Sequence, residues 1–118
     1  MAVIDAPTTT WVDVCPVDRI IPNRGVCAKA GPFQVAVFRV DAGDGEQLLA
    51  LSNYDPFSKA YVLSRGIVGS RGDRVKVASP VYKQSFDLRT GECLDDPAVS
   101  VATFPVRLVH GRVQVALP

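Results

Sequence analysis

The residue types that most often carry metal or nucleophilic chemistry are rare in this chain. There are three cysteines, Cys15, Cys27 and Cys93, and one histidine, His110. The cysteines have no C-x-x-C spacing, and an all-cysteine iron–sulfur cluster would need four thiolates. The lone histidine offers no evident Ser-His-Asp or Cys-His arrangement, and neither glycine-rich nucleotide-binding motif occurs. The sequence therefore favours a chain without a catalytic, metal or nucleotide site of its own, in which the cysteines are structural thiols.

Two proline-containing stretches stand out instead. In the first, Leu49–Phe57, a predicted strand ends in Ser-Asn-Tyr-Asp-Pro-Phe. The second, Ser79–Glu92, reads SPVYKQSFDLRTGE. A predicted strand enters its proline loop, a second short strand leaves the loop, and a Thr-Gly turn then reverses the chain. The second stretch is therefore the frame of a binding loop held between two strands, and the first is a loop that follows one strand.

Short strands must position these two loops. Apolar alternation predicts strands at Thr10–Cys15, Gly25–Ala30, Gln34–Val40, Gln47–Ser52, Gly66–Gly69, Val75–Ala78, Ser85–Leu88, Val99–Leu108 and Arg112–Leu117. Turns are expected at 31–32, 41–46 and 110–111, and a loop over 53–66. In the strand 34–40, one face is predicted to carry Val35 and Val37, and the other Ala36, Phe38 and Val40. No segment has a helical period, so residues 1–118 are predicted to form one all-β domain, an antiparallel sandwich or small barrel.

Composition narrows the class of protein. The chain is 47% hydrophobic and 21% charged, which is typical of a globular domain. Its net charge of +1 is too small to indicate nucleic acid or an anionic membrane as a partner. No apolar run approaches the roughly 20 residues that span a bilayer. The first ten residues show neither a basic nor an apolar signal region. We therefore expect a reduced, cytoplasmic protein with no nucleic-acid or membrane partner.

The second stretch resembles a cluster-binding box of Rieske iron–sulfur domains, Cys-Pro-x-His-Gly-x-x-Phe-Asp-x-x-Thr-Gly-Glu. Six residues of that box are present, as Pro80, Phe86, Asp87, Thr90, Gly91 and Glu92. Ser79 stands in place of the Cys and Tyr82 in place of the His. In the first stretch, Asp55 and Phe57 stand in the corresponding places around a retained proline. The resemblance implies a Rieske-like fold, but a Rieske centre needs two cysteines and two histidines, so no [2Fe–2S] cluster is expected.

A closer similarity runs through Ser52–Lys59, Tyr82–Gln84 and Thr90–Pro97. These segments resemble the small subunit of assimilatory NAD(P)H-dependent nitrite reductase, a family without cluster ligands. The resemblance implies a large partner subunit that carries sirohaem, a [4Fe–4S] cluster and FAD, and that reduces nitrite to ammonium. It implies a non-catalytic role for this chain, with no cofactor of its own. A free-standing Rieske-like binding module is the alternative that the sequence leaves open.

The four changed ligand positions suggest a replacement for the metal. Phe57 and Tyr82 are expected to fill the vacated volume and to stack. The hydroxyl groups of Tyr82 and Ser79 and the carboxylate of Asp55 are expected to hydrogen-bond one another or the loop amides, which would tie the two loops together. Alternatively, all four are solvent-facing loop positions.

Basic residues gather near the same loops. From Lys59 to Lys83 there are six basic residues and one acid, Asp73. If both loops lie at one end of the molecule, that end is positive and could steer docking onto an acidic partner. Tyr54, Lys59, Lys83 and Gln84 are the predicted contacts. The alternative is a solvated segment whose charges only maintain solubility.

Overall fold

The computed structural model describes residues 9–41 and 45–118 and confirms the all-β prediction for them. The strands are β1 (Trp11–Pro16), β2 (Arg24–Ala30), β3 (Phe33–Asp41), β4 (Glu46–Ser52), β5 (Tyr54–Asp55), β6 (Ala60–Tyr61), β7 (Ile67–Arg71), β8 (Arg74–Ala78), β9 (Ser85–Asp87), β10 (Thr103–Phe104), β11 (Val106–Val109) and β12 (Arg112–Ala116). Two short 3-10 helices are η1 (Val17–Arg19) and η2 (Leu63–Arg65). Within these ranges, the chain has no helix that is both long and apolar enough to cross a membrane.

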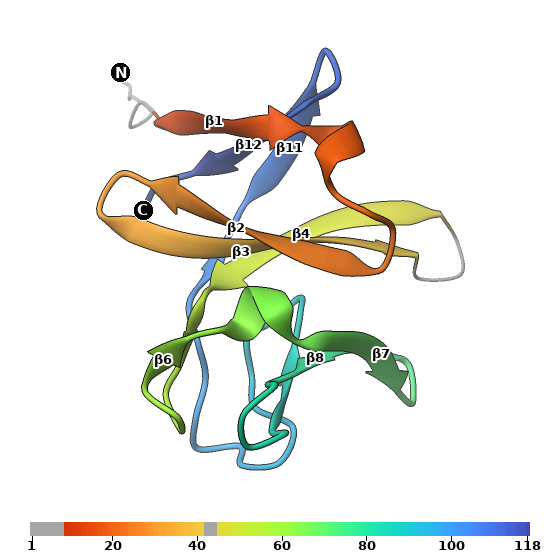
Figure 1. Ribbon diagram of the computed structural model, residues 1–118, viewed down its shortest axis with the longest axis vertical. Helices are drawn as coiled ribbons and strands as arrows, with labels where there is room; N and C mark the ends of the chain where they lie inside the picture. Colours follow the sequence, from red (N-terminus) through yellow and green to blue (C-terminus); the bar gives the residue numbers. More distant parts are fainter. Residues whose placement is uncertain (1–8, 42–44) are drawn as a thin grey trace, which may run out of the picture.

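The strands form three layers (Figure 1). The middle layer is an antiparallel sheet with the strand order β10-β4-β3-β2. The sheet β1-β12-β11 covers one face of it. On the other face lie η2, the small hairpin β5-β6 and the sheet β7-β8-β9. The proline loops of both stretches, at residues 55–59 and 79–83, belong to this last layer.

β3 explains why the middle sheet is buried on both sides. Successive side chains of a strand point to opposite faces. Val35 and Val37 therefore pack toward β12, whereas Ala36, Phe38 and Val40 pack toward β8 and β9. All five are at most 1% exposed. The predicted division of this strand into two faces is confirmed.

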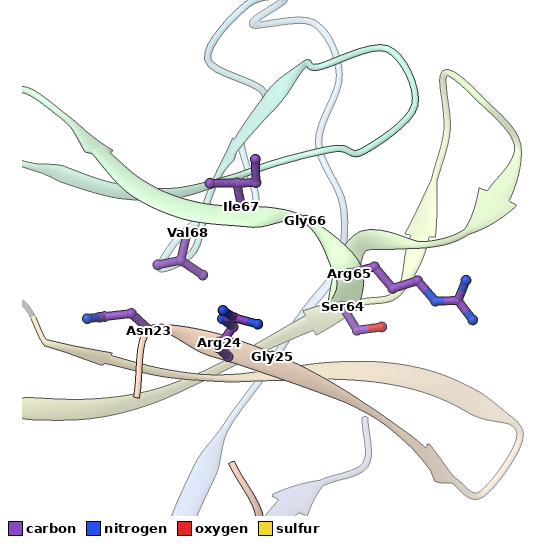
Figure 2. Close-up of a pocket in the computed structure, with 8 residues that line it drawn as sticks. All are labelled: Asn23, Arg24, Gly25, Ser64, Arg65, Gly66, Ile67 and Val68. Atoms are coloured by element: carbon purple, nitrogen blue, oxygen red, sulfur yellow. The ribbon is translucent and has the colours of Figure 1, made fainter. Parts of the chain in front are cut away.

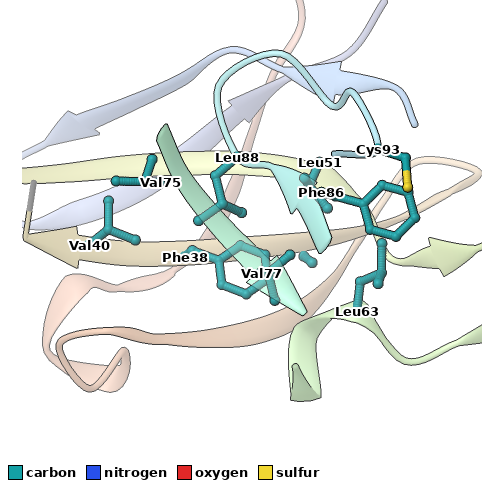
Figure 3. Packing of buried hydrophobic residues seen from close by; sticks show 10 residues of the cluster. Phe38, Val40, Leu51, Leu63, Val75, Val77, Phe86, Leu88 and Cys93 are labelled. Atoms are coloured by element: carbon teal, nitrogen blue, oxygen red, sulfur yellow. The ribbon is translucent and has the colours of Figure 1, made fainter. Parts of the chain in front are cut away.

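The core beneath the two proline loops is closely packed. Figure 3 shows Phe38 and Leu51 of the middle sheet facing Val77 of β8 and Phe86 of β9, with Leu63 of η2 beside them. All five side chains are fully buried. Burial of a side chain of this size contributes about 1.5–3 kcal/mol. The loops that follow β4 and β8 therefore start from anchored strands.

Two predicted segments differ from the structure. The predicted strand 99–108 is divided by Pro105 into β10, which pairs with β4, and β11, which pairs with β12. Proline has no N–H to donate to a ladder, which accounts for the break. The predicted loop 53–66 contains the hairpin β5-β6 and η2. The central part of the predicted turn 41–46, residues 42–44, lies outside the described residues.

The closing hairpin was predicted correctly. β11 and β12 pair antiparallel and are joined at His110 and Gly111. Their φ angles are +50° and +77°. Two central residues with positive φ are characteristic of a tight hairpin turn that matches the twist of the strands.

Candidate functional site

The two proline loops have the same backbone construction. In the first, the amide of Lys59 donates to the carbonyl of Asp55 (2.7 Å); in the second, the amide of Lys83 donates to the carbonyl of Ser79 (3.1 Å). Both lysines have positive φ, +59° and +69°. Each loop is thus a five-residue turn that closes on a left-handed lysine. In the Rieske box, the position of Lys83 is a glycine, the residue for which this conformation carries no steric penalty.

Asp55 and Ser79 join the two loops. The Ser79 hydroxyl donates to Oδ2 of Asp55 at 2.5 Å. The two residues are 0% and 1% exposed. Asp55 also accepts hydrogen bonds from the Phe57 amide (2.9 Å) and the Ser58 hydroxyl (2.9 Å). The predicted hydrogen bond between Ser79 and Asp55 is confirmed, and it connects segments 24 residues apart in the sequence.

These contacts keep the Asp55 carboxyl ionised. Burial raises its pKa, because a carboxylate loses water on entering the protein. The hydrogen bonds from Ser79, Phe57 and Ser58 favour the charged form and outweigh that effect. The pKa of Asp55 therefore lies below its usual value. A buried carboxylate with these donors is suited to holding two loops together.

The expected stacking of Phe57 on Tyr82 is wrong. The Phe57 ring packs instead near Phe86, with ring centroids 6.1 Å apart and planes inclined by 47°. Phe57 thereby extends the core under the loops. Tyr82 is 61% exposed, so its ring does not fill the volume between the loops. Of the four changed ligand positions, Asp55 and Ser79 are buried, Phe57 is half-buried against the core, and Tyr82 lies at the surface.

The retained part of the second box supports its turn. Asp87 is 4% exposed and accepts hydrogen bonds from the Arg89 amide (2.7 Å), the Thr90 amide (3.1 Å) and the Arg74 guanidinium (2.7 Å). Burial raises the pKa of Asp87, but these donors together bring it below its usual value. Gly91 has a φ of +79°, and a Cβ there would collide with the carbonyl oxygen of Val101. Asp87 and Gly91, which this chain shares with the Rieske box, therefore have structural roles in the turn that need no metal.

The predicted contact residues lie in or beside the loops. Lys59 and Lys83 are exposed, and Tyr54 is half-buried with its ring centroid 5.1 Å from that of Tyr61. Gln84 is half-buried, and its side-chain Oε1 is buried without a hydrogen-bond partner among the described residues.

The positive charge of this segment is partly neutralised. Arg71 pairs with Asp95 (3.1 Å) and Arg74 pairs with both Asp87 (2.7 Å) and Glu92 (2.8 Å). The net positive charge at these loops is therefore smaller than the sequence count indicated.

Asn53 is a structural residue within the predicted loop 53–66. It is 1% exposed and its Oδ1 accepts a hydrogen bond from the Ser64 amide at 2.7 Å. Its Nδ2 donates to Gln34 Oε1 (3.2 Å) and Cys27 Sγ (3.4 Å). Asn53 thereby fastens η2 to the middle sheet. The available signal was that Asn53 directly follows the predicted strand that ends at Ser52.

These residues do not fit a [2Fe–2S] cluster. Rieske irons take cysteine thiolates and histidine nitrogens, whereas these loops present carboxylate, hydroxyl and phenyl groups. The Asp55 carboxylate already accepts three hydrogen bonds, two from its own loop and one from the other loop. Within residues 9–41 and 45–118, no three His, Cys, Asp or Glu side chains are grouped so as to hold a metal ion.

Comparison with known proteins defines the family. The family model for the Rieske-like [2Fe-2S] domain matches residues 10–116. The nitrite reductase (NADH) small subunit of Escherichia coli K12 is 44% identical over 105 residues, which cover 89% of this chain and 95% of that protein. This chain belongs to the Rieske-like family of nitrite reductase small subunits. It is therefore homologous to subunits of an oxidoreductase.

Solved structures of similar fold support this family assignment. The NMR structure of the E. coli protein NirD superposes with a TM-score of 0.84 and 41% identity, and the alignment covers 93% of this chain and 98% of NirD. A ferredoxin of carbazole 1,9a-dioxygenase from Nocardioides aromaticivorans superposes with a TM-score of 0.76 and 26% identity over 92% of this chain and 99% of that protein. The fold is thus shared with ferredoxins.

One relative is a much larger protein. The nitrite reductase [NAD(P)H] large subunit of Klebsiella oxytoca is 39% identical over 109 residues, which cover 92% of this chain and 11% of that protein. A domain of this family therefore also occurs as a small part of a longer nitrite reductase polypeptide.

Proposed function

We propose that this chain is the non-catalytic small subunit of a cytoplasmic NAD(P)H-dependent nitrite reductase and binds no iron–sulfur cluster. Its partner is the large subunit, which on this proposal carries sirohaem, a [4Fe–4S] cluster and FAD and reduces nitrite to ammonium. The similarity to small subunits over most of the chain supports this role. The Klebsiella relative supports proximity to a large subunit, because there a similar domain is part of that polypeptide. Residues 1–118 act as one Rieske-like domain.

The observation that carries the proposal is the hydrogen bond between Asp55 and Ser79. In a Rieske domain a metal centre connects the two loops. Here a buried carboxylate and a hydroxyl connect them, and neither group exchanges electrons. The fold therefore retains the loop arrangement without a redox centre. Every redox step then belongs to the large subunit, while this chain contributes stability or geometry to the complex.

The proposed docking face is the end that carries the two loops. Lys59 and Lys83 supply exposed positive charge from equivalent turns. Tyr54 and Gln84 lie beside them.

Co-expression with the large subunit of the same organism tests the role. We expect the two chains to copurify, and we expect nitrite-dependent NADH or NADPH oxidation to be higher with this chain than without it. The chain alone should be colourless, and incubation with iron and sulfide should give no stoichiometric iron uptake. A chain that neither binds the large subunit nor changes its activity would instead be a free-standing binding module. Stoichiometric iron uptake would refute the absence of a cluster.

Charge reversal tests the docking face. Lys59→Glu with Lys83→Glu should weaken association with the large subunit, because both ammonium groups would become carboxylates on the face proposed to meet an acidic surface. Lys29→Glu is the control, since Lys29 is an exposed lysine of β2 outside both loops. Equal effects of the loop and control variants would contradict the assignment.

A further inference from the structure

A groove lies between β2 and β7, and none of the residues that line it belongs to either proline loop. It is formed by Asn23, Arg24, Gly25, Ser64, Arg65, Gly66, Ile67 and Val68 and has a volume of about 700 Å³. Figure 2 shows the start of β2 on one side and the start of β7 on the other, with η2 at one end. A second hollow continues along β7 through Gly69 and Ser70 and shares Asn23 and Val68 with the first. Together they follow β7 from Ile67 to Ser70.

Both walls of the groove are edge strands. β7 is the terminal strand of the sheet β7-β8-β9, and β2 is the terminal strand of β10-β4-β3-β2. In the described part of the chain, the outer edge of β7 pairs with no strand. Four of its five residues are exposed, including Ile67 at 70%, and it contains no proline. Proteins usually protect such an edge, because its free N–H and C=O groups can pair with another strand.

Two glycines of the groove lie directly against the core. A Cβ at Gly25 would lie 2.5 Å from Cε1 of Phe38 and 3.0 Å from the Ser64 carbonyl oxygen. A Cβ at Gly66 would lie 2.6 Å from Cγ2 of Val77. Both glycines therefore let the main chain on the two sides of the groove pack closely on the core.

The charge of the groove near η2 is positive. Arg24, the first residue of β2, lines the groove, and Arg65 extends outward at its η2 end (Figure 2). Both are exposed, and neither forms an ion pair with a described acidic side chain. None of the eight residues that form this hollow is acidic. Acidic side chains would therefore complement this end.

We propose that the groove receives an extended, acidic segment of the nitrite reductase large subunit, which adds as a strand to the free edge of β7. The five residues of β7 extend over about 17 Å, at about 3.3 Å per residue, which is enough for a short added strand. Main-chain hydrogen bonds to β7 supply the attachment, and carboxylates near Arg24 and Arg65 fix the position of the segment. This inference rests on the proposed function, since it assigns a contact to the same partner.

Amide hydrogen exchange on the full-length chain, alone and with the purified large subunit, tests this contact. We expect exchange in 67–71 to slow by at least about tenfold in the complex, because strand pairing protects amides that are open in the free chain. The double variant Arg24→Glu with Arg65→Glu should bind the large subunit about tenfold or more weakly.

A matched control separates this contact from general charge effects. Arg19→Glu with Lys29→Glu makes the same change in net charge at exposed residues that line a different hollow, between β1 and β2. This control should bind within about twofold of the unchanged chain. Circular dichroism of both double variants verifies that each is folded.

The outcomes distinguish this inference from the proposed function. A complex that forms while β7 exchanges as fast as in the free chain overturns the groove contact and leaves the subunit role intact. Equal weakening by the two double variants also overturns it. Protection of β7 in a homodimer of this chain, without the large subunit, would assign the groove to a second copy and overturn the proposal. Absence of any complex would overturn both the subunit role and the groove contact.

Discussion

The hydrogen bond between Asp55 and Ser79 gives the sharpest test of how the loops are held. Ser79→Ala removes one of three donors to a carboxylate that is 0% exposed. A hydrogen bond to a charged group contributes about 1.5–3 kcal/mol. Because the Phe57 amide and the Ser58 hydroxyl still donate to Asp55, we expect the free energy of unfolding to fall by an amount near the lower end of this range, about 1.5–2 kcal/mol.

Replacing the carboxylate itself should cost more. Asp55→Ala leaves the hydroxyls of Ser79 and Ser58 and the amide of Phe57 without their acceptor. At about 1 kcal/mol or more for each, the expected loss is at least about 3 kcal/mol. The double variant should lose less than the sum of the two single changes, because both remove the same bond. The expected coupling energy is about 1–2 kcal/mol.

Urea unfolding followed by circular dichroism at neutral pH measures these free energies. Tyr82→Ala is the control from the same loop, and we expect it to change the free energy of unfolding by no more than about 0.5 kcal/mol, because the side chain is 61% exposed. A coupling energy close to zero would refute the view that Ser79 and Asp55 connect the loops. The same view would be refuted if Tyr82→Ala lowered the free energy of unfolding as much as Ser79→Ala does.

Three further predictions concern the same loops. Folding lowers the pKa values of Asp55 and Asp87, so the unfolded chain takes up protons before the folded chain as the pH falls. The free energy of unfolding should therefore decrease below about pH 4. Acid unfolding should show a less steep decrease for Asp55→Asn than for the unchanged chain. Gly91→Ala should destabilise by at least about 2 kcal/mol in thermal unfolding, through its positive φ and the collision with Val101; a neutral result would contradict the turn geometry. Lys83→Gly should raise stability by up to about 1 kcal/mol, and a loss would show that the lysine side chain outweighs its backbone strain.

Much of the fold could be predicted from local patterns. The apolar side chains from Val35 to Val40 point alternately into two hydrophobic clusters, because β3 lies between them. The closing hairpin was predictable because His110-Gly111 separates two alternating segments. These features depend on short-range periodicity and turn chemistry, which the sequence displays directly.

The errors arose where tertiary contacts decide the local structure. Pro105 divides a continuous alternating segment between two sheets, so the period alone overstated the length of the strand. The hairpin β5-β6 has only two residues in each strand, too few for a recognisable period. Tyr82 was assigned to the interior because a ligand position is usually buried, but the turn that ends at Lys83 leaves its ring in solvent. Nothing in the residue type determines that direction.

The equivalence of the two loops bears on how they keep their shape without cluster ligands. Each loop closes its own turn by a backbone hydrogen bond, from Lys59 to Asp55 and from Lys83 to Ser79. Each also receives side-chain support at its first residue, where the Asp55–Ser79 bond lies. Phe57 adds apolar contact with the core below. The loops are therefore shaped locally and need a connection only at their first residues, which one buried carboxylate provides. The side chains of the two lysines and of Tyr82 are exposed and take no part in this connection, which is why they are the positions proposed for contact with a partner.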